Sequence, residues 1–154
     1  MRKKLLFLLF ILSFFTFPVF ALISELEQKL TQKGLADITS LNSEILVEMK
    51  YSTPDNFMKK DVYGDFHSCY LQKEVAQMFS KAAKALQKNH PGYRFLAYDC
   101  ARPRSVQRVM WSLVKGTPDQ GYVADPEKGS IHNYGSAVDL TVVDEKGAPL
   151  DMGT

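Results

Sequence analysis

The chain has 154 residues, of which 45% are hydrophobic and 23% charged, with 19 Lys and Arg against 17 Asp and Glu. Three of the basic residues and none of the acidic residues lie in residues 1–21, so residues 22–154 hold 16 basic and 17 acidic residues, a formal charge of −1. Without a net positive charge or a cluster of Lys and Arg interleaved with aromatic residues, the chain is not expected to bind nucleic acid.

Residues 1–21 have the pattern of an export signal. A basic start at residues 2–4 precedes an apolar run from Leu5 to Phe17, Pro18 breaks the run, and Ala21 stands at a position typical of cleavage. We therefore predict a periplasmic or secreted protein that contacts the membrane only through this segment. The alternative is an uncleaved anchor, because residues 5–23 are nearly long enough to span a bilayer.

The remainder, residues 22–154, is long enough for one domain with a single core. Apolar spacing and turn residues predict helices over 24–33, 71–89 and 105–115, strands over 44–51, 93–99 and 136–143, and a returning strand over 148–154. Residues 52–68 and 117–129 read as polar loops, and a loop as long as the first is often functional. This order of elements predicts an α+β fold, with an antiparallel sheet and helices packed on one side.

Two cysteines, Cys69 and Cys100, fall in a chain that is predicted to be exported. A disulfide can form in an oxidising compartment, and closing this loop would stabilise the fold by about 3 to 4 kcal/mol in the chain-entropy model. Two separate buried thiols remain the alternative, since the sequence does not give the distance between them.

The most informative segment is residues 130–140. It contains six residue types at fixed spacing, Ser-x-His-x-x-Gly-x-Ala-x-Asp-Leu, with His132 and Asp139 seven residues apart. A neutral imidazole and a carboxylate are ordinary Zn²⁺ ligands. Gly135 allows a sharp turn between them, and Asp139 falls in a predicted strand, which holds a ligand rigidly.

In this pattern the chain resembles the VanX-type D-alanyl-D-alanine dipeptidases, within the zinc D,D-peptidase and Hedgehog-like group. The resemblance covers nearly all of residues 22–154, and it places His132 and Asp139 at two of the three zinc-ligand positions of the family. Residues 98–103, Tyr-Asp-Cys-Ala-Arg-Pro, resemble the segment with the family's active-site arginine, which falls on Arg102. Residues 50–57 resemble the segment whose tyrosine lines the dipeptide pocket, which falls on Tyr51, and residues 150–154 resemble the stretch after the zinc motif.

The resemblance implies zinc-dependent hydrolysis of D-alanyl-D-alanine or a related cell-wall dipeptide, with Arg102 stabilising the oxyanion. Ser130 either hydrogen-bonds the substrate or shapes the loop. The chain has Ala101 where the family often has a larger residue, and residues 1–154 contain no counterpart of the Glu-x-x-His segment that supplies the family's third zinc ligand and catalytic glutamate. With two ligands and no evident general base, we expect weak metal binding and slow turnover.

Three other interpretations remain open. A D,D- or L,D-carboxypeptidase would act on longer peptidoglycan peptides, a truncated relative would bind such peptides without turnover, and a separately encoded piece could supply the missing ligand. The other two histidines, His67 and His90, lie in a polar loop and at a helix end, where a solvated side chain is the expected role.

Overall fold

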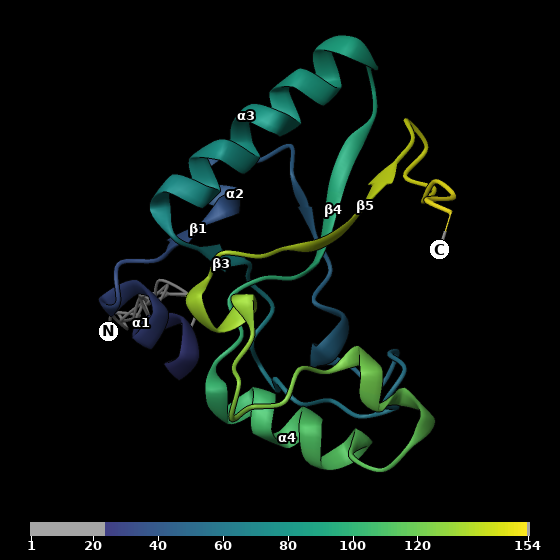
Figure 1. The fold of residues 1–154 in the computed structure, drawn as a ribbon. Helices are drawn as coiled ribbons and strands as arrows, with labels where there is room; N and C mark the ends of the chain where they lie inside the picture. The colour runs from purple at the N-terminus through teal and green to yellow at the C-terminus, as the bar shows by residue number, and fades with distance from the viewer. Residues whose placement is uncertain (1–23, 154) are drawn as a thin grey trace, which may run out of the picture.

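The computed structural model describes residues 24–153. In chain order its elements are α1 (Glu25–Gln32), β1 (Ala36–Asp37), α2 (Ile38–Leu41), β2 (Leu46–Val47), the 3₁₀ turn η1 (Lys50–Ser52), β3 (Tyr70–Leu71), α3 (Lys73–Asn89), β4 (Arg94–Asp99), α4 (Arg104–Val114), the 3₁₀ turns η2 (Pro118–Tyr122) and η3 (Ile131–Tyr134), and β5 (Asp139–Val143). In Figure 1, α3 runs along β4, and α4 lies beyond the end of β4 away from α3. The predicted α+β class is confirmed.

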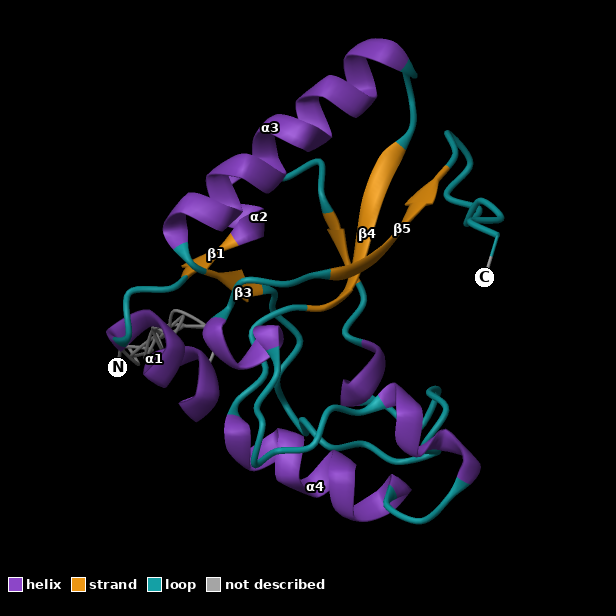
Figure 2. Cartoon of the chain, viewed as in Figure 1, coloured by secondary structure: helices purple, strands orange, loops and turns teal. Residues whose placement is uncertain are grey.

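The main sheet is mixed, which corrects the prediction of an antiparallel sheet. Its strand order is β2-β4-β5, with β2 parallel and β5 antiparallel to β4; β1 and β3 form a separate antiparallel pair. Parallel pairing needs a long crossover connection, and the segment between β2 and β4 provides one that contains α3. Figure 2 shows the short strands gathered at the centre of the molecule.

The predicted strand over 44–51 is mostly irregular. Ile45 and Met49 are buried as their alternation indicates, but only Leu46 and Val47 pair with β4, and the chain then turns into η1. That turn brings Tyr51 toward the carboxyl end of β4 instead of extending the strand. The loss of regular pairing therefore helps to form the site described below.

The helices follow their predicted signals closely. In α1, the Ser24 side chain accepts from Glu27 N while the Glu27 side chain accepts from Ser24 N, the reciprocal capping box that the sequence indicates. In α3, the buried face is Ala76, Phe79, Ser80 and Ala83, whereas the apolar side chain of Met78 is exposed.

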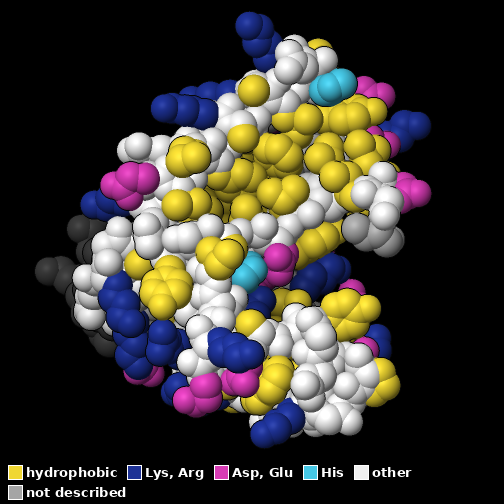
Figure 3. All heavy atoms as spheres, in the orientation of Figure 1, with side chains coloured by type: hydrophobic (Ala, Val, Ile, Leu, Met, Phe, Trp, Pro, Cys, Tyr) yellow, Lys and Arg dark blue, Asp and Glu magenta, His cyan; other side chains and the backbone are white. Residues whose placement is uncertain are grey.

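The described residues form two hydrophobic clusters. The larger one contains Phe79 of α3, and the partly buried Phe95 of β4 packs against it with ring centroids 5.3 Å apart. The smaller one consists of Met110, Val114 and Val123, which pack with residues of the 51–62 segment. Figure 3 shows the surface hollowed between the part with α3 and the sheet and the part with α4.

A disulfide joins Cys69 and Cys100, which decides between the two alternatives for these cysteines. Both residues are 0% exposed, and the bridge links the residue just before β3 to the residue just after β4. The predicted export signal, residues 1–21, lies outside the described residues. Within residues 24–153, no helix has the length and apolar character that crossing a membrane requires.

Gly135, which ends η3, offers a test of this packing. Its φ is +65°, and a Cβ there would lie 2.8 Å from Leu35 Cδ2 and 3.3 Å from Gln72 N. Gly64 has a similar φ of +60° but nothing within 4 Å of such a Cβ. We expect Gly64→Ala to lower the free energy of unfolding by about 1 kcal/mol, from backbone strain alone, and Gly135→Ala by roughly 1 to 3 kcal/mol more, from overpacking.

Urea denaturation of the two variants measures this difference. Equal losses of stability for Gly64→Ala and Gly135→Ala would show that η3 does not pack against Leu35 and Gln72 as described.

Candidate active site

His132 is fixed by the short helix η3. Ser130 caps this helix, with its hydroxyl accepting from His132 N at 3.3 Å, and Gly135 ends it in the left-handed conformation. The imidazole Nδ1 lies 2.8 Å from the backbone oxygen of Cys100. A carbonyl oxygen can only accept, so Nδ1 carries the proton and Nε2 presents its lone pair in the neutral ring.

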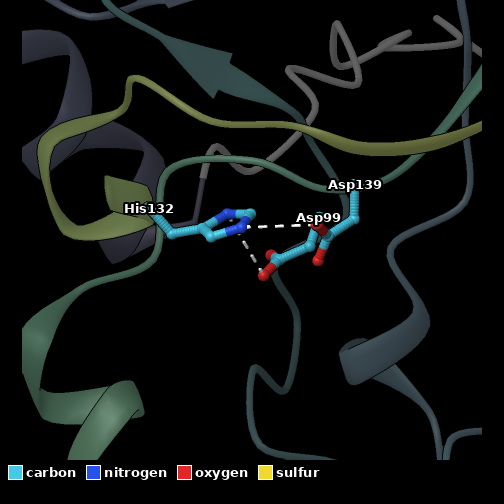
Figure 4. A group of neighbouring side chains, drawn as sticks. All are labelled: Asp99, His132 and Asp139. Atoms are coloured by element: carbon cyan, nitrogen blue, oxygen red, sulfur yellow. Dashed lines mark ion pairs between the residues drawn. The ribbon is translucent and has the colours of Figure 1, made fainter. Parts of the chain in front are cut away.

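Asp139 is the first residue of β5, and its carboxylate faces this lone pair. Asp139 Oδ1 lies 3.4 Å from His132 Nε2, and Figure 4 shows the two side chains pointing toward one another from separate segments. The His132 side chain is 13% exposed and that of Asp139 is 50% exposed, so the pair lies at the edge of the solvent.

Each partner shifts the pKa of the other. Burial lowers the pKa of His132, but the hydrogen bond with Asp139 and the negative charge of Asp99 outweigh it and raise that pKa above its ordinary value. The hydrogen bond that a protonated His132 Nε2 donates lowers the pKa of Asp139 against the opposing effect of burial, and the charge of Arg102 lowers it further. The pair therefore has an ionised carboxylate at neutral pH.

The donor set fits a zinc ion. A histidine ligand ordinarily donates its second ring N–H to a carbonyl or carboxylate, as Nδ1 does here toward Cys100 O, and this leaves Nε2 for the metal beside a carboxylate oxygen. Among the described residues, Asp99, His132 and Asp139 form a group whose potential ligand atoms all lie within 4.8 Å of one another.

Asp99 is not available as a third ligand. It is 0% exposed, Oδ1 accepts from Tyr63 OH at 2.7 Å, and Oδ2 accepts from Arg102 Nε at 2.9 Å and also from Arg102 Nη2. Its distance of 3.7 Å is to His132 Nδ1, the nitrogen that already carries a proton. The described residues thus direct two side chains, His132 and Asp139, at a common point.

Arg102 lies beside this pair and is held from several sides. Its side chain is 5% exposed, and in addition to the Asp99 contacts its Nη1 donates to Gln107 Oε1 at 3.0 Å. Nη2 lies 3.9 Å from Asp139 Oδ2. Burial lowers the pKa of Arg102, but the Asp99 carboxylate outweighs this effect and raises it, so the guanidinium stays charged.

Tyr51 forms one wall of the site. The Arg102 guanidinium carbon lies 5.5 Å from the centroid of its ring, and Phe57 packs edge-on against that ring with centroids 6.1 Å apart. Burial, opposed by the charge of Arg102, raises the pKa of Tyr51 to about 12, so its phenol is neutral at physiological pH.

The structure brings four of the five predicted site residues together: Tyr51, Arg102, His132 and Asp139. The fifth, Ser130, is half-buried and serves as the cap of η3, which agrees with the loop-shaping alternative and leaves its contact with a substrate a prediction.

Sequence reasoning missed three residues of the site: Asp99, Tyr63 and Gln107. Asp99 stands inside the segment already singled out around Arg102, three residues before it, so the need of a buried arginine for a carboxylate could have identified it. Tyr63 lies in the long 52–68 loop and is joined to Asp99 across 36 residues, and Gln107 looks like an ordinary helical residue, so neither gave a local signal.

A separate cavity of about 770 Å³ lies between α1 and the start of α4. Its walls include Asn133 and Tyr134 but not Arg102, His132 or Asp139. The chemistry of the side chains, not the size of this cavity, therefore locates the candidate site.

The chain is similar to known proteins over most of its length. The family model described as D-ala-D-ala dipeptidase (Peptidase_M15) matches residues 31–154. D-alanyl-D-alanine dipeptidase of Escherichia coli (strain K12) is 34% identical over 119 residues, which cover 77% of this chain and 58% of the relative. The chain therefore spans little more than half the length of this relative.

The Asp99–Arg102 pair leads to a prediction on stability. Asp99→Asn removes the charge that compensates a buried guanidinium, and we expect it to lower the free energy of unfolding by about 3 kcal/mol or more. The control is Asp55→Asn, because the Asp55 side chain is 83% exposed and contacts Lys50 at 3.5 Å; this change should cost less than about 1 kcal/mol.

Both free energies are measured by urea denaturation at neutral pH. If Asp99→Asn lowers the free energy of unfolding no more than Asp55→Asn does, the buried pair does not stabilise the fold.

Proposed function

Since the chain belongs to the D-alanyl-D-alanine dipeptidase family, we propose that its site binds Zn²⁺ and serves the hydrolysis of D-alanyl-D-alanine or a related cell-wall dipeptide. One observation carries the proposal: His132 Nε2 and Asp139 Oδ1 face one another at 3.4 Å while Nδ1 is tied to Cys100 O. The name of the E. coli relative supports the choice of substrate.

His132 and Asp139 would hold the ion. When the imidazole is neutral, the two negative charges of Asp99 and Asp139 exceed the single positive charge of Arg102, so the site has a formal charge of −1. A negative charge favours the binding of a cation. When bound, Zn²⁺ supplies Lewis-acid polarisation of a carbonyl and lowers the pKa of water toward 7.

Arg102 would stabilise negative charge on the carbonyl oxygen during hydrolysis. A guanidinium has five N–H groups, and three of them are used, Nε and one of Nη2 by Asp99 and one of Nη1 by Gln107. One N–H on each terminal nitrogen is left for a substrate oxygen. Donors that are fixed before the reaction stabilise an oxyanion most effectively, because they need no reorganisation.

Tyr51 and Ser130 would bind the substrate. The Tyr51 ring closes one side of Arg102 and excludes water from the guanidinium face, while Ser130 adjoins the zinc ligand on η3. A small pocket of this kind selects a dipeptide by pairing its polar ends.

Catalytic zinc sites ordinarily use three protein ligands, and the described residues direct two. Activity therefore has to be measured on this chain and on a chimera that adds the remaining length of the E. coli relative. We also propose a periplasmic or secreted location, supported by the basic and apolar composition of residues 1–21 and by the Cys69–Cys100 disulfide.

Zinc binding is the first test. We expect His132→Ala and Asp139→Asn each to weaken the affinity for Zn²⁺ by about 10-fold or more, because each removes one oriented ligand. His90→Ala is the matched control, since His90 is exposed and stacks on Tyr93, and it should leave the affinity unchanged.

Isothermal titration with zinc chloride measures the affinities, and circular dichroism verifies that each variant is folded. Equal zinc affinity in the parent protein and His132→Ala would rule out the ligand assignment.

Hydrolysis of D-alanyl-D-alanine is the second test. In the chimera, we expect Arg102→Lys to lower kcat by about 10²-fold to 10³-fold, the usual effect of losing an oxyanion donor, with zinc content unchanged. Release of D-alanine from the free dipeptide and from a pentapeptide is measured side by side. Faster hydrolysis of the pentapeptide would favour the carboxypeptidase alternative, and peptide binding without turnover would favour a non-catalytic relative.

A further inference from the structure

Gln107 occupies a core position of α4. Helical spacing places it on one face with Met110 and Val114, and the three residues are 0%, 1% and 3% exposed. Burying an amide costs free energy unless its polar atoms are hydrogen-bonded. A hydrophobic side chain would ordinarily fill such a position, so the presence of Gln107 is explained by the contacts of its amide.

Both ends of this amide are used, and they join two parts of the site. Oε1 accepts from Arg102 Nη1 at 3.0 Å, and Nε2 donates to the backbone oxygen of Ala124 at 2.6 Å. The second bond spans 17 residues and reaches the segment that leads into Ser130 and η3.

Asp99 alone leaves the guanidinium incompletely fixed. Its Oδ2 contacts Nε and Nη2, which lie on one edge of the planar group. Because both hydrogen bonds end on the same oxygen, the guanidinium can still rotate about that oxygen. The contact of Gln107 with Nη1 holds the third nitrogen and removes this freedom. The two uncommitted N–H groups of Arg102 then have a set direction, with Nη2 3.9 Å from Asp139 Oδ2.

We propose that Gln107 is a positioning residue, whose side-chain oxygen fixes the plane of the Arg102 guanidinium and whose amide N–H ties that orientation to the Ala124 backbone. Its effect on hydrolysis rests on the function proposed above. Its effect on the orientation of Arg102 does not, so the two are measured separately.

Two substitutions separate the two hydrogen bonds. Gln107→Met keeps an unbranched side chain of similar length and loses both bonds. Gln107→Glu keeps the acceptor for Arg102 Nη1 and loses the donor to Ala124. A residue that merely anchors the Ala124 segment would respond equally to both changes, whereas a positioning residue responds much more strongly to Gln107→Met.

The first readout is the NMR spectrum of the protein labelled with ¹⁵N-arginine, in which Arg102→Lys assigns the Arg102 signals by their loss. We expect resolved Nη1 protons in the parent and in Gln107→Glu, because a hydrogen bond restricts rotation about Cζ–Nη1, and averaged ones in Gln107→Met. The Nε–H signal, which depends on Asp99, should persist in all three. Parent-like Nη1 signals in Gln107→Met, or equal loss in both variants, would overturn the proposal.

The second readout is the hydrolysis of D-alanyl-D-alanine by the chimera. We expect Gln107→Met to lower kcat by roughly 10-fold to 100-fold, the usual effect of losing a residue that orients a site residue, with KM changed by less than about 2-fold. Ser105→Ala, an exposed position on the same helix, is the control and should match the parent. An unchanged kcat in Gln107→Met would contradict the catalytic consequence, whereas an inactive parent would contradict the proposed function and leave the NMR result to decide the positioning.

Discussion

The buried ion pair between Asp99 and Arg102 is the constraint on which the site depends. Removing two charges from water costs several kcal/mol per ion, and only close contact with further hydrogen bonds offsets this cost. Here the further bonds come from distant parts of the chain: Tyr63 from the long loop donates to Asp99, and Gln107 from α4 accepts from Arg102. Because each contact is needed to compensate a buried charge, the pair fixes where the 52–68 loop and α4 meet the end of β4.

The backbone between these two charged residues supports the rest of the site. The oxygen of Cys100 orients His132, the N–H of Ala101 donates to Tyr70 O at 2.9 Å, and the N–H of Arg102 donates to His132 O at 2.9 Å. The disulfide between Cys100 and Cys69 also ties this segment to the residue before β3. The arginine and His132 are therefore positioned by one stretch of four residues, and Asp139 pairs with its first residue, Asp99, in the β4–β5 ladder, so a shift of this stretch moves both halves of the site together.

The sequence predicted the parts of the site that are local and missed those that depend on distant contacts. The six-residue pattern over 130–140 and the resemblance singled out His132 and Asp139, and the structure brings the two side chains together because η3 and β5 are adjacent in the chain. The resemblance singled out Tyr51 and Arg102, and the structure places the Arg102 guanidinium carbon 5.5 Å from the centroid of the Tyr51 ring. Alternation at Ile45 and Met49 indicated burial correctly but not the turn into η1, and no local pattern reveals that β2 pairs parallel to β4. Those features depend on which strands pair with one another, and strand pairing is determined by packing between residues that are distant in the chain.

The distribution of satisfied and unsatisfied polar groups distinguishes this site from an ordinary buried network. Among the described residues, no buried side-chain nitrogen or oxygen lacks a hydrogen-bond partner, and the interior members Asp99 and Gln107 are saturated by contacts within the protein. The remaining capacity lies on the outer side, in Nε2 of His132, the half-exposed carboxylate of Asp139 and two N–H groups of Arg102. A network with a purely structural role has no need for such an asymmetry. An imidazole and a carboxylate that can bind a cation therefore lie next to fixed N–H groups that can donate to a substrate oxygen, and the proposed hydrolysis would use both features.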